Sequence, residues 1–489
     1  MPLNRRHFLH AAAVSPLWAW ALPAEQPEVA RRDPQGWPSD NPFLQENFAP
    51  VHEEVTVEHL KVVGRLPREL DGIFVRNGPN PQFPPRNRYH WFDGDGMLHG
   101  VRLFDGKASY RNRYVRTKKF LSEKKAGKSL ASSLLDPPTG GPPSNAANTA
   151  LVWHAGKFLA LWEAGLPHEI QLPDLETVGE YDFRGQWKSA FTAHPKVDAH
   201  SGEMVFFGYG VAKPEVQFGI VTADGKLRRS ETVALPRAVM MHDFAMTERY
   251  AVFLDLPATF DMGRALRGEP IISFEPKHGA RLGLLPRQAG AIRWFDIPPC
   301  YVFHTLNAYD DGEDVVLLAC RYARLPEIFP AQGKYELSQM IPAHLYRWRV
   351  RVNEGRVTEE QVDDAVVDFP RVADRVVGRP SRYGYAAEVH GLHFIGLVKY
   401  DLQTGACVRH SFGKGRLGGE GVFVQRPDAR AEDDGWLLTY VFDQAAGRSE
   451  LIVVDAQAFN KPPVARILLP QRVPYGFHGL WIPSRHWVG

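Results

Sequence analysis

Four histidines of this chain stand inside apolar, β-rich runs instead of on charged loops. They are His194 in SAFTAHPKVDAH, His242 in RAVMMHDFAM, His304 in CYVFHTLNAYDDG and His478 in VPYGFHGLW. Imidazole nitrogen is a suitable ligand for iron, copper, nickel and zinc. A lone histidine in such a run is more often a core residue with satisfied nitrogens, and intervals of 48, 62 and 174 residues form no metal motif. The four could share one ion only in a fold that brings distant segments to one axis.

The stretch HWFDGDGMLHG, residues 90–100, is a second concentration of possible ligands. It places His90, Asp93, Asp95 and His99 among glycines that would let the backbone fold tightly around an ion. The same composition is typical of a tight turn between strands, with glycines at positive φ and aspartates accepting from backbone amides. The residues of this stretch leave both interpretations open.

Motifs of other catalytic classes do not account for the chain. It contains no HExxH, no Walker loop and no GxSxG elbow, and the GxGxxG match at 413–418 has no long helical pattern after it. Its three cysteines lack CxxC spacing, which argues against a zinc site or a disulfide framework. Cys300 and Cys320 could pair across a hairpin, but three small buried hydrophobes are the simpler interpretation.

The elements that must position the histidines are short strands. Runs such as GEMVFFGYG, EDVVLLACRYA and DGWLLTYVFD alternate with turns such as ADGK, NEGR and TGA, the connections that join antiparallel strands. Helical periodicity is confined to pieces such as 118–131. Hairpins repeated over so long a stretch predict an all-β propeller, since a sandwich would be far shorter. Seven blades would have roughly 63 residues each.

Composition and charge limit the kinds of partner that the chain is expected to bind. The chain has 489 residues, 44% of them hydrophobic and 23% charged, with a net charge of +2. No long run of like charge occurs, so no nucleic acid partner is expected.

The N-terminus indicates export. In MPLNRRHFLHAAAVSPLWAWALPAEQ, paired arginines precede an apolar stretch that is shorter than the roughly 20 residues needed to span a bilayer. We interpret residues 1–24 as a twin-arginine signal peptide. Residues 25–45 form a linker or arm, and 46–489 one propeller domain that we expect to be periplasmic.

The histidine segments belong to a longer series of motifs. These are LPRELDGIFVRNGPNP (66–81), HWFDGDGMLHG, TAHPKVD (192–198), HDF (242–244), EGVFVQRPDARAEDDGWLL (420–438), SELIVVDA (449–456) and LPQRVPYGFHGLW (469–481). In this order, over about residues 45–485, the series resembles the carotenoid cleavage oxygenase family. That family includes enzymes that cleave carotenoids, apocarotenoids and lignin-derived stilbenes, and a retinoid isomerohydrolase.

The resemblance implies a seven-bladed β-propeller with a few helices and long loops capping the face that carries the active site. It implies one Fe(II) on the axis, with O₂ as co-substrate, and cleavage of a carbon–carbon double bond into two carbonyl products. Carried over by motif, the iron ligands are His194, His242, His304 and His478. No residue of HWFDGDGMLHG corresponds to a family ligand, which favours the turn interpretation for that stretch.

The resemblance also implies three carboxylates that accept the outer N–H of three of these histidines. They map to Glu163, Asp368 and Glu420. The family usually has Glu where Asp368 stands, so we expect a shifted backbone or a bridging water there; its proline after the third acid is Gly421 here. Thr149 matches a threonine that in some relatives sits beside the vacant iron position, although it could equally be an ordinary strand residue.

Substrate choice is indicated by one position. Stilbene-cleaving members carry a lysine just before the first carboxylate, and this chain has Trp162, which favours an apolar polyene along a substrate tunnel. Residues 116–135 resemble the stilbene cleavers, so a stilbene substrate remains the alternative. A second alternative is a propeller that binds or isomerises a polyene without oxidation. Residues 118–135 or 260–270 could supply an apolar patch for peripheral membrane contact.

Overall fold

A computed structural model describes residues 37–38, 41–86, 89–130, 133, 145–267, 269–326 and 341–487. The predicted signal peptide, residues 1–24, and most of the predicted arm lie outside these ranges. No helix within them is long and apolar enough to cross a bilayer. Residues 41–48 of the arm region form two short 3₁₀ helices, and Phe43, Leu44 and Phe48 in them are buried against the main body.

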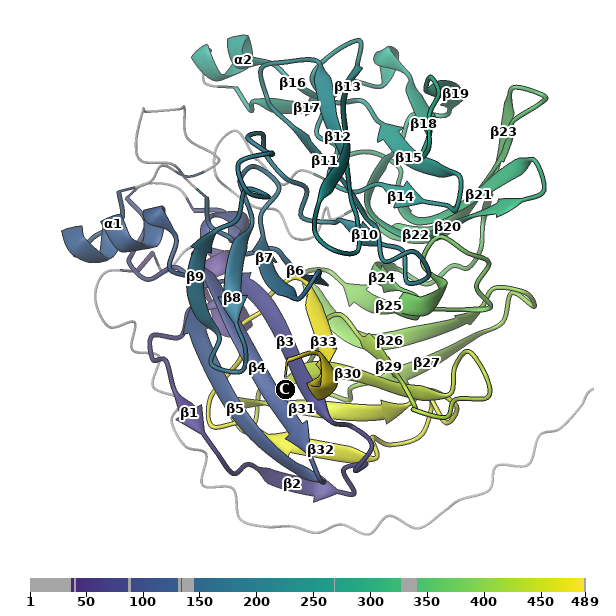
Figure 1. Cartoon of the computed structure of the whole chain (residues 1–489). Coiled ribbons are helices and arrows are strands. Elements are labelled where there is room, and N and C mark those ends of the chain that lie inside the picture. Colours follow the sequence, from purple (N-terminus) through teal and green to yellow (C-terminus); the bar gives the residue numbers. More distant parts are fainter. Residues whose placement is uncertain are drawn as a thin grey trace, which may run out of the picture.

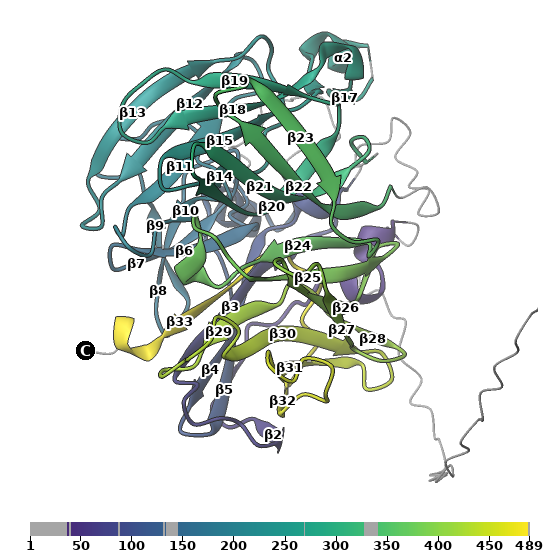
Figure 2. The same cartoon turned by 90° about the vertical axis from the view of Figure 1, so that its right-hand side faces the viewer.

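Seven antiparallel sheets are arranged radially, as the blades of a propeller (Figure 1). In most blades the strands follow one another along the chain from the axis outwards. Figure 2 shows the strands of blades 5, 6 and 7 next to one another. The predicted fold class is confirmed.

Blades 1 to 4 are built as follows. Blade 1 contains β33 (Gly479–Pro483), β3 (Gly72–Pro79), β4 (Gly96–Phe104), β5 (Lys107–Tyr114) and β1 (Thr56–Val57). Blade 2 contains β6 (Ala150–His154), β7 (Lys157–Leu161), β8 (His168–Gln171) and β9 (Glu176–Glu180). Blade 3 contains β10 (Lys196–Val197), β11 (Met204–Tyr209), β12 (Glu215–Val221) and β13 (Leu227–Ala234). Blade 4 contains β14 (Ala245–Met246), β15 (Tyr250–Asp255), β18 (Ala280–Pro286) and β19 (Arg293–Ile297).

Blades 5 to 7 complete the ring. Blade 5 contains β20 (Tyr301–Asp311), β21 (Asp314–Tyr322), β22 (Ala343–Arg351) and β23 (Arg356–Gln361). Blade 6 contains β24 (Val367–Arg371), β25 (Tyr383–His390), β26 (His393–Asp401) and β27 (Cys407–Ser411). Blade 7 contains β29 (Val422–Gln425), β30 (Gly435–Asp443), β31 (Arg448–Asp455), β32 (Ala465–Leu468) and β2 (Lys61–Gly64), and β28 (Arg416–Leu417) also pairs with β30.

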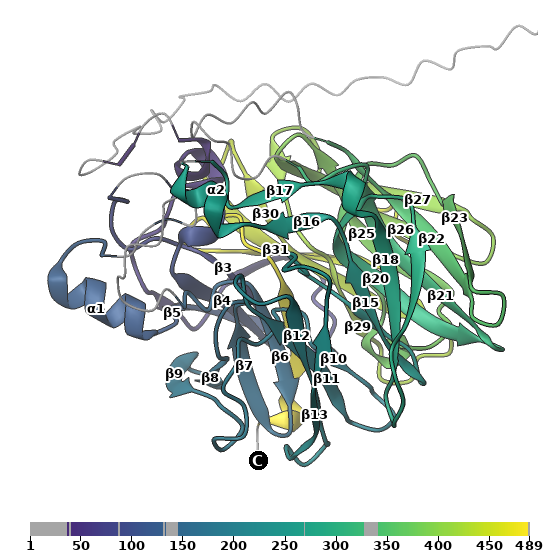
Figure 3. The ribbon, with the colours of Figure 1, turned by 90° about the horizontal axis from the view of Figure 1, so that it is seen from above.

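Helices are few among the described residues, and they lie in connections between strands or at the two ends of the chain. They are α1 (Lys118–Ala126), α2 (Met262–Leu266) and the 3₁₀ turns η1 (Pro42–Leu44), η2 (Glu46–Phe48), η3 (Trp91–Asp93), η4 (Pro276–His278), η6 (Asp374–Val376) and η7 (Ser484–His486). Figure 3 shows α2 beside its hairpin, β16 (Ala258–Phe260) and β17 (Ile272–Phe274). The helix expected over 118–131 ends earlier, because Gly127 adopts a left-handed φ of 64° and caps α1.

Both ends of the chain close the ring. The C-terminal β33 becomes the innermost strand of blade 1 by pairing with β3, and the N-terminal β2 becomes the outermost strand of blade 7 by pairing with β32. A Cβ at Gly72 would stand 2.5 Å from the carbonyl oxygen of Ile482, so the first of these seams requires glycine at this position. Blades 1 and 7 therefore form only when segments some 400 residues apart meet.

The hydrophobic core lies between neighbouring blades. Phe207 and Phe218 of blade 3 pack with Phe253 of blade 4, and Leu254 of blade 4 belongs to the same buried cluster as Trp348 of blade 5. Cys300 and Cys320 are free and fully buried, and Cys407 is half-buried. Burying apolar surface between blades stabilises the ring at roughly 25 cal/mol per Å², and this packing fixes the innermost strands around the axis.

Candidate metal centre

The innermost strands of all seven blades begin on one face of the propeller, and a polar residue lies close to each of these starts. From blade 1 to blade 7 these residues are His478, Thr149, His194, His242, His304, Asp368 and Glu420. Glu163 follows the end of β7, which reaches the same face because β7 runs antiparallel to β6. The ring therefore gathers every residue of the predicted site at one end of the axis.

The four histidines point toward one another. The Nε2 atoms of His194 and His242 are 3.0 Å apart, and ring nitrogens of His194, His304 and His478 lie within 4.8 Å of one another. Ring centroids are separated by 4.6 Å for His194 and His242 and by 4.9 Å for His304 and His478. The sequence intervals carried no metal motif, and the radial fold is what brings the four rings together.

Three of the rings are held from behind by carboxylates. The Nδ1 atoms of His242, His304 and His478 lie 2.5, 2.8 and 2.9 Å from oxygens of Glu163, Asp368 and Glu420 respectively. A carboxylate accepts hydrogen bonds, so each Nδ1 carries the proton. The Nε2 atom of a neutral ring then keeps its lone pair for an ion on the axis.

Each carboxylate is itself held through its second oxygen. Glu163 accepts from the Tyr209 hydroxyl at 2.9 Å, and Asp368 accepts from the Tyr322 hydroxyl at 2.5 Å. Glu420 accepts from the backbone N–H of Gly479 at 2.8 Å. Neither tyrosine could be predicted from the sequence, since a tyrosine at the end of a strand carries no signal that distinguishes it from an ordinary core residue.

Asp368 makes its contact directly. Its Oδ1 reaches His304 without a bridging group, and it also accepts from the N–H of Phe369 at 2.8 Å. The pairing of β24 with β25 is irregular between Asp368 and Arg371, and Phe369 has a φ of 54°, which is strained for an aromatic residue. The backbone is thus locally distorted where the shorter side chain stands, as one of the two expected adjustments requires.

Burial keeps two of the imidazoles neutral. It lowers the pKa of His478 to about 4, against the opposing charge of Glu420, and it holds the pKa of His194 well below its usual value together with the other three rings. Burial acts to lower the pKa of His242 too, but the charge and hydrogen bond of Glu163 raise it. Neutral rings are the form that binds metal.

Thr149 and Trp162 lie beside these groups. The carbonyl oxygen of Thr149 accepts the backbone N–H of His478 at 3.2 Å, and the Thr149 hydroxyl donates to Asn148 Oδ1 at 2.9 Å. Trp162 immediately precedes Glu163 and is only 9% exposed. Both residues are therefore next to the histidine–carboxylate cluster.

Residues 90–100 serve the fold. His90 caps η3 by accepting from the N–H of Phe92, and Asp93 accepts from the N–H of His90. Asp95 pairs with the buried Lys119 of α1 at 2.7 Å, and His99 Nδ1 lies 2.8 Å from the Tyr110 hydroxyl. The stretch forms a 3₁₀ turn and the start of β4, and it anchors α1. Its aspartates accept from backbone amides as expected, but the expected glycines at positive φ are wrong: Gly94 has a φ of −62°, and Gly96 and Gly100 lie within β4.

One buried acid links three of the histidine-bearing segments. Asp243, next to His242, forms an ion pair with Lys196 at 2.7 Å. Its other oxygen accepts from the backbone N–H of Thr305 at 2.7 Å and from its hydroxyl at 2.8 Å. Lys196 and Thr305 lie two and one residues beyond His194 and His304. Asp243 therefore fixes the spacing of blades 3, 4 and 5 at the axis.

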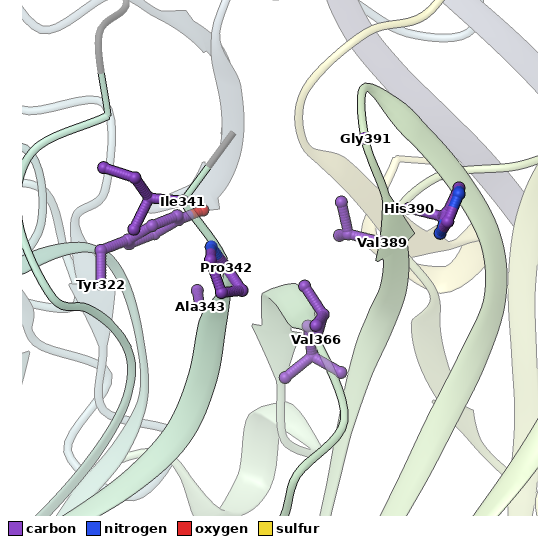
Figure 4. Close-up of a pocket in the computed structure, with 9 residues that line it drawn as sticks. Tyr322, Ile341, Pro342, Ala343, Val366, Val389, His390 and Gly391 are labelled. Carbon is purple, nitrogen blue, oxygen red and sulfur yellow. The ribbon is translucent and has the colours of Figure 1, made fainter. Parts of the chain in front are cut away.

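A pocket of about 240 Å³ opens on the same face between blades 5 and 6 (Figure 4). Its walls are mostly apolar: they come from Tyr322, the segment 341–343, Val366, Val367 and the β25 end at 389–391. Tyr322 is both a wall of this pocket and the partner of Asp368. An apolar space thus lies beside Tyr322, which contacts His304 through Asp368.

The donor set fits one transition-metal ion. Two ligands at right angles, each about 2.1 Å from an ion, stand about 3 Å apart, which is the separation found between the Nε2 atoms of His194 and His242. All four donors are imidazoles, which suit iron, copper, nickel and zinc. A propeller with such a cluster on its axis defines a single-metal enzyme centre.

The sequence and structure of this chain are similar to those of known proteins. The profile of the retinal pigment epithelial membrane protein family matches residues 48–483. The carotenoid 9,10(9',10')-cleavage dioxygenase 1 of Arabidopsis thaliana is 38% identical, covering 90% of this chain and 89% of its own. The lignostilbene dioxygenase of Pseudomonas brassicacearum has a TM-score of 0.87 at 32% identity, covering 92% of this chain and 99% of that one.

Solved variants of the Synechocystis apocarotenoid oxygenase are also similar. The tryptophan-to-alanine variant has a TM-score of 0.82 at 29% identity, covering 89% of this chain and 97% of its own. Other solved forms alter a threonine and a glutamate or contain cobalt. The threonine, tryptophan and glutamate have the same order and spacing as Thr149, Trp162 and Glu163.

The chain belongs to the retinal pigment epithelial membrane protein family and is an oxidoreductase of the carotenoid cleavage dioxygenase type. The matched residues span the whole propeller, from before β1 to the end of β33. This confirms the resemblance drawn from the sequence motifs.

Histidine substitutions separate ligands from structural histidines. We expect His242→Ala to lose bound metal, because it removes a ring nitrogen from the cluster, whereas His90→Ala and His99→Ala retain it. Metal content per folded chain, measured by inductively coupled plasma mass spectrometry, checks this. Metal loss in the His90 variant with retention in the His242 variant would reverse the assignment.

Asp243→Asn tests the link between blades. The change leaves Lys196 without its charge partner, and breaking a buried ion pair costs about 3 kcal/mol. We expect a lower free energy of unfolding in urea and a reduced affinity for metal. The exposed pair of Asp224 and Lys226 offers the control, since Asp224→Asn should alter neither quantity measurably. Equal effects of the two substitutions would contradict the role of Asp243.

Proposed function

We propose that this enzyme binds one Fe²⁺ through His194, His242, His304 and His478 and cleaves a carbon–carbon double bond of a carotenoid or apocarotenoid with O₂. The products are two aldehydes or related carbonyl compounds. The observation that carries the proposal is the convergence of four imidazoles from four blades, three of them held by Glu163, Asp368 and Glu420.

Iron would supply the site at which O₂ is activated, and the chain supplies position and environment. Glu163, Asp368 and Glu420 keep three Nδ1 protons in place, so that the opposite nitrogens remain free to bind the ion. No carboxylate belongs to the ligand set, which leaves the ion cationic. Thr149 bonds to His478 through its backbone, and we propose that it would restrict the access of O₂ to the ion. No protein acid or base is assigned a proton transfer.

The substrate is proposed to be an apolar polyene. Trp162 offers an indole where stilbene-cleaving relatives present a lysine ammonium, so no cation is available there to pair with a phenolate. The Synechocystis apocarotenoid oxygenase shares the tryptophan at this spacing. The apolar pocket beside Tyr322 could take one end of such a molecule.

Stilbene cleavage is the second candidate. It is favoured by the similarity of the whole propeller to the P. brassicacearum lignostilbene dioxygenase, with a TM-score of 0.87. The two candidates share the metal centre and differ in the groups that hold the ends of the substrate.

Product analysis decides between the candidates. Iron-loaded protein is incubated under ¹⁸O₂ with an apocarotenoid and, separately, with a hydroxystilbene. We expect ¹⁸O-labelled aldehydes from the apocarotenoid, identified by mass spectrometry. Labelled aldehydes from the stilbene alone would establish the alternative. Bound polyene with neither aldehyde nor O₂ uptake would indicate a binding or isomerising protein and overturn the proposal.

Membrane contact is proposed to be peripheral, through α1 and α2. Leu121 and Met262 on these helices are 51% and 40% exposed, and α1 carries Lys124 and Lys125 in its last turn. Apolar tips beside basic residues suit the surface of an anionic membrane.

Periplasmic localisation by export in the folded state is also proposed, resting on Arg5 and Arg6 before the apolar stretch. Four imidazoles bind Cu²⁺ or Zn²⁺ more tightly than Fe²⁺ by the Irving–Williams order, so cytoplasmic loading before export protects the choice of metal. Replacing residues 1–24 with a Sec signal should yield periplasmic protein loaded with copper or zinc. Unchanged iron content after the replacement would contradict this proposal.

A further inference from the structure

We propose that Tyr322 is a positioning residue for the metal centre: its hydroxyl fixes the Asp368 carboxylate, and through it the His304 ring. The inference rests on the proposed role of His304 as a metal ligand. Asp368 is the only aspartate among the three carboxylates that hold the histidines, and its side chain is one methylene shorter than those of Glu163 and Glu420.

The two Asp368 oxygens have different partners. Oδ1 lies 2.8 Å from His304 Nδ1 and accepts from the N–H of Phe369, whereas Oδ2 accepts from the Tyr322 hydroxyl at 2.5 Å. Asp368 is 6% exposed, so little solvent is available to replace a lost partner. Removing the hydroxyl would leave a buried carboxylate oxygen unpaired, and the carboxylate would rotate or draw in a water.

The backbone beneath Asp368 adds a reason for this dependence. Phe369 holds the strained φ of 54°, and its ring packs against His304 at 4.7 Å and His478 at 5.0 Å between centroids. A strained segment persists only where its surroundings fix it. Two bonds restrain Asp368 from the neighbouring blade 5: one from His304 and one from Tyr322, and only the second leaves the proposed ligand itself unchanged when it is removed.

Tyr322 is itself held in place. It ends β21, and its ring packs edge-on against Phe303 at 5.5 Å between centroids, one residue before His304. The ring also lines the pocket between blades 5 and 6 (Figure 4). Replacement by phenylalanine would keep the ring and remove only the hydroxyl.

Tyr301 offers a matched control. It is fully buried and also packs edge-on against the Phe303 ring, with centroids 4.8 Å apart. Among the described residues its hydroxyl has no hydrogen-bond partner. Tyr301→Phe therefore makes the same chemical change beside the same neighbour without touching Asp368.

The test uses cobalt(II) binding to metal-free, full-length protein, with affinity measured by competition with a chelator and the electronic spectrum of the bound ion recorded. We expect Tyr322→Phe to weaken binding about tenfold, the lower end of the range for partners of metal-ligating histidines, and to shift the cobalt absorption bands. Tyr301→Phe should stay within about twofold of the parent protein, the difference that an independent site would show. Both metal-free variants should be folded at the temperature of the binding measurement, and Tyr322→Phe should melt lower than Tyr301→Phe, because it alone leaves a buried carboxylate oxygen unpaired.

A double-mutant cycle completes the experiment. If Tyr322 acts through Asp368, then Tyr322→Phe added to Asp368→Ala produces no further loss of affinity. Equal affinity losses in the Tyr322 and Tyr301 variants, no loss in the Tyr322 variant, or additive losses in the cycle would overturn the inference. The comparison of Tyr322→Phe with Tyr301→Phe tests the role of Tyr322 even if Asp368→Ala does not fold. A parent protein that takes up no cobalt would instead overturn the proposed function.

Discussion

The hydrogen bonds between carboxylates and imidazoles at the axis are the interactions on which the rest of this structure depends. Four histidines facing one another would repel if they were protonated. Rings that could turn would also not keep Nε2 directed at the axis. Burial answers the first problem, because it lowers the pKa of His194 and His478 and keeps these rings neutral. Glu163, Asp368 and Glu420 answer the second, because each holds an Nδ1 proton and directs Nε2 to the axis. Such acids are costly to bury alone. The surrounding donors, which are two tyrosine hydroxyls and backbone amides, offset that cost.

The propeller supplies the geometry that these bonds need. Each innermost strand begins on one face, so a residue near its start is delivered to the axis irrespective of its position in the sequence. Asp243 then sets the spacing of three neighbouring histidine segments through Lys196 and Thr305. Both chain ends close the ring, so the metal centre depends on contacts between the first and last hundred residues. Catalytic geometry and global folding are coupled in this architecture.

The architecture and the four histidines could be predicted from different features of the sequence. Repeated hairpins indicated a propeller, but the number of blades and the convergence of His194, His242, His304 and His478 came from family motifs, since their spacing carries no local rule. Tyr209, Tyr322 and Asp243 could not be predicted, because their importance lies in contacts between blades that periodicity does not encode. The closure of the ring by β2 and β33 could not be predicted either, because each is a short strand whose partner lies at the other end of the chain. The end of α1 at Gly127, by contrast, was readable from residue type and was missed.

Anomalous diffraction at the iron edge from crystals of the iron-loaded protein tests the central claim most directly. The account predicts a single strong peak enclosed by the Nε2 atoms of His194, His242, His304 and His478, with Asp368 and the two glutamates outside its coordination sphere. A peak at residues 90–100, or one ligated by any of the three carboxylates, would contradict it.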